Sequence, residues 1–340
     1  MRILHTLLSS GFAGTERATA EMCNALCDRH EVLLAAGRGH RNRAGASILD
    51  HLDPRVQVRE LGRWFPGSDL ARLVREWRPD VIHTHLRKST RLIARLRPPC
   101  ATVATLHMWV NGPHFLQMDG LIVIAQWQKQ GLTHYRGRVF DINESLLPQP
   151  RLTPERIAQL RALAKAAPGE FLIGGVGRLA ESKGFDVLIR AFRAAALPQA
   201  KLVLIGAGRE HARLEQLAAG LPVCFLGFRT DAKDFYQAFD LFVSPSRSEP
   251  LGRVLFEALD AGVPVLATRT QGPTEILARY PGRLIPIDDV EAMADALREL
   301  AAAPPAHMRP DLTPYHLEQV CRETEAAYRE LIAARQSSAR

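Results

Sequence analysis

Two glutamates separated by seven residues lie in the stretch SRSEPLGRVLFEALDAGVP, residues 246–264. Glu249 directly follows an apolar run that predicts a strand, and Gly252 permits a close backbone approach to a ligand. A helix predicted to begin near Arg253 would point free backbone N–H groups at a phosphate. Glu257 lies one turn further along the same face, where a carboxylate can accept hydrogen bonds from two ribose hydroxyls. The spacing therefore indicates a nucleotide site.

A second group of charged residues follows another predicted strand, in the segment GVGRLAESKG. Arg178 offers a planar fork of donors and Lys183 a compact positive charge, and both stand near glycines. Two cations at the end of a strand suit a diphosphate, and they can offset the charge that develops as a diphosphate departs. We therefore interpret the pair as a diphosphate clamp.

Both segments also have a purely structural interpretation. Glu249 could cap the helix and Glu257 could be a solvated helix residue, although a solvated charge fits the apolar run VLFEAL poorly. Lys183 could pair with Glu181 at an ordinary helix start. The functional interpretation is favoured because the two segments follow strands of the same predicted domain, where the carboxyl ends of parallel strands share one edge.

The elements that position these residues are predicted by short apolar runs that alternate with amphipathic helical patterns. Parallel sheets with helices on both faces produce this alternation. The predicted strands are RILHTLL, HEVLLAA, VQVREL, DVIHTH, ATVATLH, GLIVIA and RVFDIN, and then FLIGGVGR, KLVLIGAG, VCFLGF, LFVSPS, VPVLATR and RLIPI. The proline-rich break LLPQPRLTPE separates the two series, so the fold class is α/β with two doubly wound, Rossmann-like domains.

We predict domains over residues 1–150 and 151–312, followed by one long helix in 313–340 that packs back toward the first domain. Ligands of open parallel sheets bind beyond the carboxyl ends of the strands. Two such domains facing each other would therefore bind their ligand in the cleft between them.

The net charge of +8 is unevenly distributed. Residues 1–165 hold 24 Lys and Arg against 14 Asp and Glu, which leaves +10, whereas the remainder carries −2. The basic stretches are RGHRNR (38–43) and LRKSTRLIARLRPP (86–99), and in the second of them Arg87, Arg91 and Arg95 share one side of a helix with Lys88 beside them. A solvated face would explain the excess, but we favour docking to an anionic lipid surface or to a phosphorylated acceptor.

Composition also bears on location. No apolar run reaches the roughly 18 residues of a transmembrane helix, and the first residues predict a strand instead of a signal peptide. The five cysteines have neither zinc-site spacing nor an even number for disulfides. We expect a reduced, cytoplasmic protein, or one that is peripheral on the inner face of the cytoplasmic membrane.

Several segments together resemble a known family. SRSEPLGRVLFEALDAGVPVLATRTQGPTEIL is similar to the E-x7-E signature of family 4 glycosyltransferases, which have the GT-B fold, and GRLAESKGFDVLIRAF is similar to that family's Arg and Lys segment. The similarity covers nearly the whole chain and is most specific over residues 170–280. Relatives that build lipopolysaccharide core or other envelope glycans resemble it most.

The resemblance implies a role for each matching residue. Residues 1–150 become the acceptor-side domain and 151–312 the domain that binds the nucleotide sugar. The implied catalytic residues are Glu249, His107, Arg178 and Lys183. The implied donor-binding residues are Gly14, Arg178, Lys183, Gly252, Arg253, Val254 and Glu257. In this scheme Glu249 lies against the donor sugar, Glu257 holds the ribose, and the two cations stabilise the departing nucleoside diphosphate.

Weaker features of the first domain point the same way. In SSGFAGTERA, Gly11 and Gly14 resemble the family's glycine-rich loop near donor phosphate and acceptor. The alternative is a plain strand-to-helix turn capped by Thr15. The acceptor side would include Gly11, Thr15 and His85.

The histidines of the first domain follow or occupy predicted strands. His107 ends ATVATLH and matches the histidine that hydrogen-bonds the donor sugar in this family, although a strand-end histidine can also be structural. His83 and His85 share one face of DVIHTH and are either structural or lining the acceptor side. No carboxylate stands at a metal-site spacing from the pair, so no metal site is predicted.

Some positions depart from the family pattern. The family often has a serine where Ala125 and Gln126 stand, Gly-Phe where Pro250 and Leu251 stand, and an Asn-Gly turn where the linker reads NESLLPQP. The choice of sugar and acceptor therefore does not transfer from the resemblance.

The chain is thus expected to be a retaining hexosyltransferase that moves a sugar from a nucleoside diphosphate, with UDP favoured, to an envelope glycolipid or oligosaccharide such as lipopolysaccharide core. No cofactor, metal or nucleic acid is expected, because D-x-D is absent and the two cations can supply the leaving-group charge. The alternatives are a nucleotide-sugar epimerase or hydrolase on the same fold, a basic nucleic-acid-binding protein, and a non-catalytic sugar-nucleotide sensor.

Overall fold

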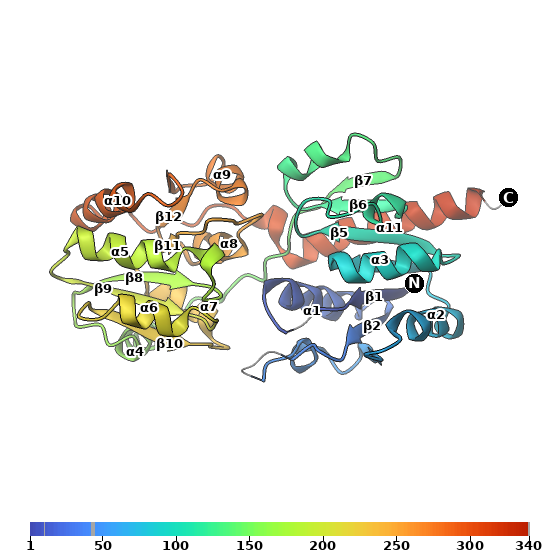
Figure 1. Cartoon of the computed structure of the whole chain (residues 1–340), viewed down its shortest axis with the longest axis horizontal. Coiled ribbons are helices and arrows are strands. Elements are labelled where there is room, and N and C mark those ends of the chain that lie inside the picture. The colour runs from blue at the N-terminus through green and yellow to red at the C-terminus, as the bar shows by residue number, and fades with distance from the viewer. Residues whose placement is uncertain (10, 42–44, 339–340) are drawn as a thin grey trace. The chain divides into compact units, whose positions relative to one another are not determined.

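The computed structural model describes residues 1–9, 11–41 and 45–338. The chain divides into two compact units, each described by itself below (Figure 1). Unit 1 comprises Met1–Leu147 together with Thr313–Arg340, and unit 2 comprises Pro148–Leu312. The end of the chain therefore belongs to the same unit as its beginning.

Unit 1 is built on a sheet of seven parallel strands in the order β3-β2-β1-β4-β5-β6-β7. The strands are β1 (Arg2–Leu7), β2 (Glu31–Gly37), β3 (Gln57–Leu61), β4 (Val81–His85), β5 (Ala101–Leu106), β6 (Gly120–Val123) and β7 (Arg138–Asp141). The order reverses direction at β1 and β4, and the carboxyl ends of neighbouring strands at such a point are the usual ligand-binding edge of this sheet type.

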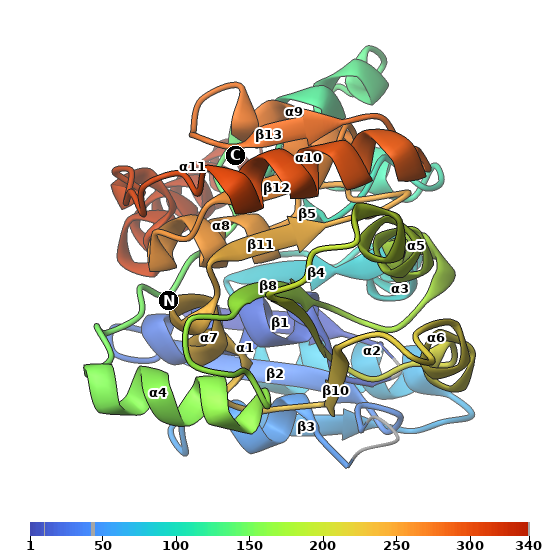
Figure 2. The same cartoon turned by 90° about the vertical axis from the view of Figure 1, so that its left-hand side faces the viewer.

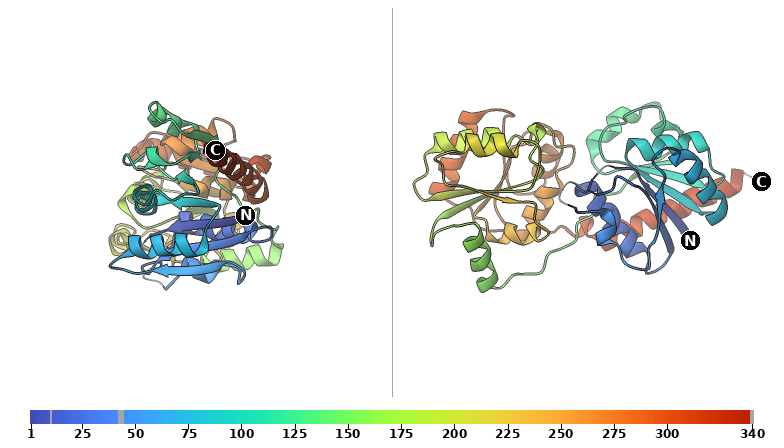
Figure 3. Two further views of the ribbon diagram at one scale, coloured as in Figure 1. Left: turned by 90° about the vertical axis from the view of Figure 1, so that its right-hand side faces the viewer. Right: turned by 60° about the horizontal axis from the view of Figure 1, so that its bottom comes forward.

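Helices cover both faces of this sheet. They are α1 (Gly14–Leu26), α2 (Pro66–Trp77), α3 (Leu86–Leu96) and the long C-terminal α11 (Leu317–Ser338), which runs along the sheet of unit 1 (Figure 3, right). Alternation along the strands separates the two faces. Leu4 and Ile82 pack in one apolar cluster with Leu70 of α2 and Ile93 of α3, whereas the adjacent His83 bonds to Tyr328 of α11.

Unit 2 is built on six parallel strands in the order β10-β9-β8-β11-β12-β13 (Figure 2). The strands are β8 (Phe171–Val176), β9 (Ala200–Ile205), β10 (Val223–Gly227), β11 (Leu241–Ser244), β12 (Val265–Thr268) and β13 (Arg283–Ile285). The helices are α4 (Pro154–Leu163), α5 (Phe185–Ala195), α6 (His211–Leu217), α7 (Ala232–Phe235), α8 (Arg253–Ala261), α9 (Gln271–Leu277) and α10 (Val290–Ala302).

Each predicted strand run is present, so the predicted α/β class with two parallel sheets is confirmed. One helix is shorter than its sequence pattern suggests. The segment DAKDFYQAFD forms α7 and then a 3-10 turn over Tyr236–Ala238, because its aromatic side chains turn into the core: Phe235 and Tyr236 are almost fully buried.

Two further sequence properties have structural counterparts. All five cysteines are free thiols. Among the helices of residues 1–9, 11–41 and 45–338, none combines the length and apolar composition needed to cross a bilayer.

The loops after β8 and β11 are held against each other in unit 2. The backbone N–H groups of Arg247 and Ser248 donate to the carbonyl oxygen of Ser182 at 2.9 and 3.3 Å. Gly184 has φ +64°, and a Cβ at this position would lie 1.9 Å from the Pro245 carbonyl oxygen. Only glycine therefore permits this approach of the two loops.

We predict that Gly184→Ala lowers the free energy of unfolding by about 3 kcal/mol or more, since left-handed strain adds to the clash with Pro245. Gly227→Ala is the matched control, because Gly227 has φ +66° but nothing within 4 Å of its Cβ position. It should cost only about 1–2 kcal/mol. Urea unfolding of both variants measures the difference, and equal losses would contradict the close loop contact.

Candidate functional site

The predicted donor residues of unit 2 gather beyond the carboxyl ends of β8 and β11. Lys183 Nζ forms an ion pair with Glu249 Oε2, and the Ser246 hydroxyl donates to the same oxygen at 3.3 Å. Only 8% of Glu249 is exposed. Glu181 lies 3.8 Å from Arg209 instead, so the pairing of Lys183 with Glu181 that the structural interpretation expected is wrong.

Arg247 holds the loop that carries Glu249. Its guanidinium donates to both oxygens of Asp186 at 2.8 and 3.0 Å and to Asp288 at 2.6 Å. Burial would raise the pKa of Asp186, but the hydrogen bonds and positive charge of Arg247 outweigh it and lower that pKa. The Glu249 loop thus rests on charge-assisted hydrogen bonds that persist at neutral pH.

Helix α8 begins at Arg253, as the spacing predicts, and Gly252 precedes it with φ +91°. A Cβ on Gly252 would lie 3.2 Å from Glu249 Cγ and 3.0 Å from Leu255 Cδ1. The glycine therefore brings the start of α8 close to Glu249, and Arg253 and Val254 lie in the first turn of the helix, where their backbone N–H groups are not used by the helix's own hydrogen bonds.

Glu257 has a structural partner that sequence reasoning missed. The Tyr236 hydroxyl donates to Glu257 Oε2 at 3.1 Å, and Arg253 Nε lies 3.7 Å from Oε1. Burial raises the pKa of Tyr236 well above its usual range, and the neighbouring Glu257 charge adds to this, so the phenol remains a donor. A carboxylate has about four acceptor sites, so Glu257 retains acceptor capacity for hydroxyls.

Arg178 follows β8 and the glycine at position 177, and its side chain is exposed. A Cβ on Gly206, after the neighbouring β9, would lie 1.8 Å from the Gly177 carbonyl oxygen. Gly206 of the segment KLVLIGAG thus lets the ends of β8 and β9 approach each other. Within the described part of the chain, the guanidinium of Arg178 has no hydrogen-bond or ion-pair partner, so this side chain is available to an anion.

The glycine-rich turn of unit 1 differs from one expectation. The N–H of Gly11, at φ +110°, donates to the Gly39 carbonyl at 2.9 Å, and α1 begins at Gly14. Thr15 does not cap the helix, because it already lies in the first turn. The side chain of Glu16 instead accepts from the Ala13 N–H at 2.9 Å, so a carboxylate satisfies the helix start.

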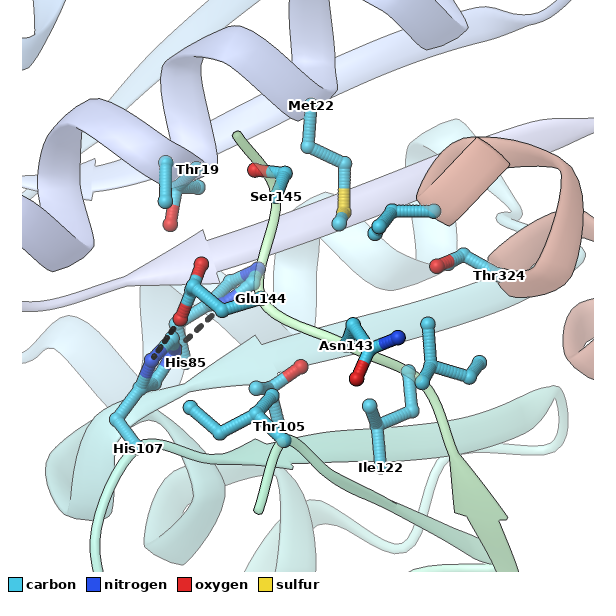
Figure 4. A pocket seen from close by; sticks show the side chains of 14 residues that line it. Thr19, Met22, His85, Thr105, His107, Ile122, Asn143, Glu144, Ser145 and Thr324 are labelled. Atoms are coloured by element: carbon cyan, nitrogen blue, oxygen red, sulfur yellow. Dashed lines mark hydrogen bonds and ion pairs between the residues drawn. The ribbon is translucent and has the colours of Figure 1, made fainter. Parts of the chain in front are cut away.

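His85 is the last residue of β4 and His107 directly follows β5, and both line a pocket of unit 1 (Figure 4). His85 Nδ1 lies 3.2 Å from His107 Nε2, and His107 Nδ1 lies 3.6 Å from the Glu144 carboxylate. Parallel pairing aligns His85 with Thr105 and so brings His107 into reach. The predicted histidines therefore meet at one strand edge, together with Glu144.

Two buried histidines extend this group into the core. His5 Nδ1 lies 3.1 Å from His85 Nε2, and His83 bonds to the Tyr328 hydroxyl at 2.6 Å and to Thr105 Oγ1 at 2.7 Å. Burial lowers the pKa of His5 to about 3 and those of His83 and His85 well below their usual range. All three are neutral at physiological pH.

The same histidines are the described residues best placed to hold a metal ion. One nitrogen from each of His5, His83 and His85 lies within 4.8 Å of the others, and neutral imidazole is the ligating form. Both nitrogens of His83 and of His85 already have hydrogen-bond partners. An ion would have to replace these bonds, so the arrangement fits a hydrogen-bonded cluster better than a metal site.

Gln128 is a buried residue that no sequence pattern singled out. Its Nε2 donates to the carbonyl oxygens of Leu106 and Met108, at 2.5 and 3.2 Å, and its Oε1 accepts from the Ile124 N–H at 2.8 Å. These carbonyls flank His107 on both sides. Gln128 therefore fixes the backbone that presents His107, a role that only the tertiary structure reveals.

Comparison with known proteins shows where this architecture occurs. The family model for "Glycosyltransferase Family 4" matches residues 12–166, and that for "Glycosyl transferases group 1" matches residues 170–303. The lipopolysaccharide core biosynthesis glycosyltransferase LpsE of Rhizobium meliloti (strain 1021) is 38% identical over 85% of this chain and 86% of its own length. LpsD of the same strain is 29% identical over 89% of both chains.

A solved structure has the same fold. Anabaena Alr3699/HepE in complex with UDP-glucose matches with a TM-score of 0.75 at 22% identity, over 99% of this chain and all of the other. Because the similarity to LpsE spans most of both chains, and because the two family models match the two units in order, this chain belongs to the family 4, group 1 glycosyltransferases and has their GT-B fold.

Proposed function

We propose that the chain is a retaining glycosyltransferase that moves a hexose from a nucleoside diphosphate, UDP being favoured, to a glycolipid or oligosaccharide of the bacterial envelope. The observation that carries the proposal is the cluster of Lys183, Glu249 and Glu257 around the start of α8. The names of LpsE and LpsD support a lipopolysaccharide core acceptor, and the UDP-glucose complex of HepE supports a UDP-sugar.

The donor would bind along the loops of unit 2. Its diphosphate would accept from the backbone N–H groups of Arg253 and Val254, where the helix dipole favours negative charge. Lys183 would turn from Glu249 toward the phosphate, since a dianionic diphosphate attracts an ammonium more strongly than one carboxylate does. Glu249 would then be free to accept hydrogen bonds from the sugar hydroxyls, and Glu257 from the ribose.

The two cations would do most of their work in the transition state. Negative charge grows on the diphosphate as the bond to the anomeric carbon breaks, and preorganised positive groups stabilise that charge. Arg178, exposed beside the loop, and Lys183 are placed to supply it. A divalent metal is not needed for the leaving group in this scheme.

An anionic membrane surface is proposed as a partner of unit 1. Arg87, Lys88, Arg91 and Arg95 of α3 are all exposed, while Ser89, Thr90, Ile93 and Ala94 on the other side are buried. Burial and then the charges of Arg87, Arg91 and Arg95 lower the pKa of His114, as expected where positive charges concentrate. Of the other basic stretch, Arg38 and Arg41 are exposed and Arg43 lies outside the described residues.

Exposed aromatic side chains lie beside this basic helix. Trp64 is 83% exposed and Phe65 74% exposed, directly before α2. The Cβ position of Gly67, in the first turn of α2, lies 3.6 Å from Leu92 of α3. Aromatic rings next to arginines are the combination that favours the interface of an anionic bilayer.

We predict that Glu257→Ala weakens binding of free UDP by about 1.5–3 kcal/mol, because a charged acceptor for two hydroxyls is lost. Tyr236→Phe is the control: it removes the structural partner of Glu257 and keeps the carboxylate. Calorimetry should find the affinity of the control near that of wild type. An equal loss in both variants would mean that Glu257 acts only through the packing of α8.

With a UDP-hexose and a lipopolysaccharide core acceptor, wild type should form glycosylated acceptor and release UDP. Arg178→Ala and Lys183→Ala should each lower the turnover number, because each loses about 2–4 kcal/mol of transition-state stabilisation. The loss of donor affinity should be smaller. Arg209→Ala, an exposed cation on a neighbouring loop, is the control.

The same assay tests the alternatives. Product analysis without acceptor should show no stoichiometric donor turnover, whereas an epimerase or hydrolase would consume the donor alone. EDTA should leave the rate unchanged. Loss of activity with EDTA and recovery with magnesium would contradict the metal-free scheme.

We predict that the protein floats with anionic liposomes at low salt and is released at 1 M salt, where the Debye length is about 3 Å. Each Lys or Arg near such a surface contributes about 1 kcal/mol, so four suffice for reversible docking. The test variant replaces Arg87, Lys88, Arg91 and Arg95 by Gln. The matched control replaces Arg190, Arg193, Arg209 and Arg213, four exposed arginines of unit 2, by Gln.

Release of the α3 variant but not of the control would support the proposal, and UDP binding should be unchanged in the α3 variant. Wild type that stays unbound at low salt would show that the basic face is solvated surface or an acceptor-phosphate site.

A further inference from the structure

Three histidines of unit 1 (His107, His85 and His5) form a continuous chain of contacts that begins at Glu144. The first contacts join the Glu144 carboxylate to His107 Nδ1 at 3.6 Å and His107 Nε2 to His85 Nδ1 at 3.2 Å (Figure 4). The chain continues from His85 Nε2 to His5 Nδ1 at 3.1 Å. The last nitrogen, His5 Nε2, is buried and has no hydrogen-bond partner among the described residues.

The Glu144 carboxylate sets the direction in which the hydrogen bonds between the histidine rings run. A carboxylate only accepts hydrogen bonds, and 3.6 Å leaves no room for a bridging water between it and His107. The contact is longer than a hydrogen bond, but at this distance the carboxylate attracts an Nδ1–H and repels an Nδ1 lone pair, so we assign the proton of His107 to Nδ1. Its Nε2 then has a lone pair, which accepts from Nδ1–H of His85, whose Nε2 in turn accepts from Nδ1–H of His5.

The opposite set of tautomers, with the proton on Nε2 of each ring, is unfavourable at both ends of the chain of contacts. It would set the Nδ1 lone pair of His107 against the Glu144 carboxylate, so that two acceptors face each other. It would also leave an N–H of His5 buried without an acceptor, and buried donors are rarely left unpaired. A charged ring does not avoid these costs. Burial opposes charge on His5 and His85, because it lowers their pKa values. A charged His107 would also donate from Nε2 to His85, which again leaves an N–H of His5 buried without an acceptor.

We infer that Glu144 is a positioning residue that holds His107, His85 and His5 in the tautomer with the proton on Nδ1. Glu144 stands in the linker NESLLPQP, where the family often has an Asn-Gly turn. A glycine there has no side chain to set the chain's direction. The tautomers would therefore be a property of this chain and not of the family pattern.

The consequence for catalysis rests on the proposed function. Nε2 of His107 is engaged by His85, and its Nδ1–H faces Glu144 at 3.6 Å, so a sugar hydroxyl could reach this N–H only beside the carboxylate. A hydroxyl that approaches it would be a donor to Glu144 or would have to take the place of Glu144 at Nδ1. Glu144 would thereby orient both the histidine and the hydroxyl.

Ring nitrogen–proton correlation NMR of ¹⁵N-histidine-labelled protein tests the inference without any substrate. Wild type should show His107, His85 and His5 with the proton on Nδ1 only. Glu144→Gln keeps the shape but offers both a donor and an acceptor, so it should give a mixture of tautomers, and Glu144→Ala should abolish the fixed Nδ1–H form. His83, which bonds to Tyr328 and Thr105 instead, should be unchanged and reports that the core is folded.

The matched control is Asp141→Asn, the same change of chemistry at an exposed carboxylate three residues earlier that pairs with Lys129. It should leave all tautomers as in wild type. The inference is overturned if wild-type His107 carries its proton on Nε2, or if Glu144→Ala leaves the three tautomers unchanged while His83 confirms the fold.

Kinetics then separate the two proposals. Glu144→Gln should lower kcat about tenfold or more, with UDP affinity unchanged and Asp141→Asn near wild type. If the protein transfers no sugar while the NMR result holds, the proposed function fails and the role of Glu144 as a positioning residue stands.

Discussion

The ion pair between Lys183 and Glu249 is the contact on which the site of unit 2 depends. It is largely buried, and removing charges from water is costly unless they are paired and hydrogen-bonded. The surrounding loops meet this requirement: Ser246 donates to Glu249, Arg247 ties the loop to Asp186, and the carbonyl of Ser182 accepts two backbone N–H groups. Contacts within unit 2 therefore hold these loops in place, with an ammonium and a carboxylate at the carboxyl edge of the sheet.

Glycines make this arrangement sterically possible. At positions 184, 206 and 272 a Cβ would lie within about 2 Å of a backbone carbonyl oxygen. Each of these glycines lies in the segment that follows a strand, at the carboxyl edge of the sheet in unit 2. The close backbone packing of these loops thus depends on the absence of side chains where the loops converge.

The buried polar groups of unit 1 are paired in a different way. They include the histidines His5, His83 and His85 in place of ion pairs, and burial keeps these three rings uncharged. Neutral groups cost less to bury than charges, but their hydrogen bonds have a direction that must agree along the chain. A single carboxylate at the pocket, Glu144, can set that direction for three rings.

The amino-acid sequence by itself determined the strands, their parallel arrangement and the position of α8, because hydrophobic periodicity and the spacing from Glu249 to Glu257 are local properties. It also predicted that Arg178 and Lys183 lie at the same edge of the sheet as Glu249, because the carboxyl ends of parallel strands share one edge. Only the tertiary structure decided which partner each charge takes: Lys183 pairs with Glu249 and not with Glu181, and Tyr236 bonds to Glu257. These partners come from segments far apart in the chain. Their distances depend on how the loops pack, and no local pattern encodes that packing.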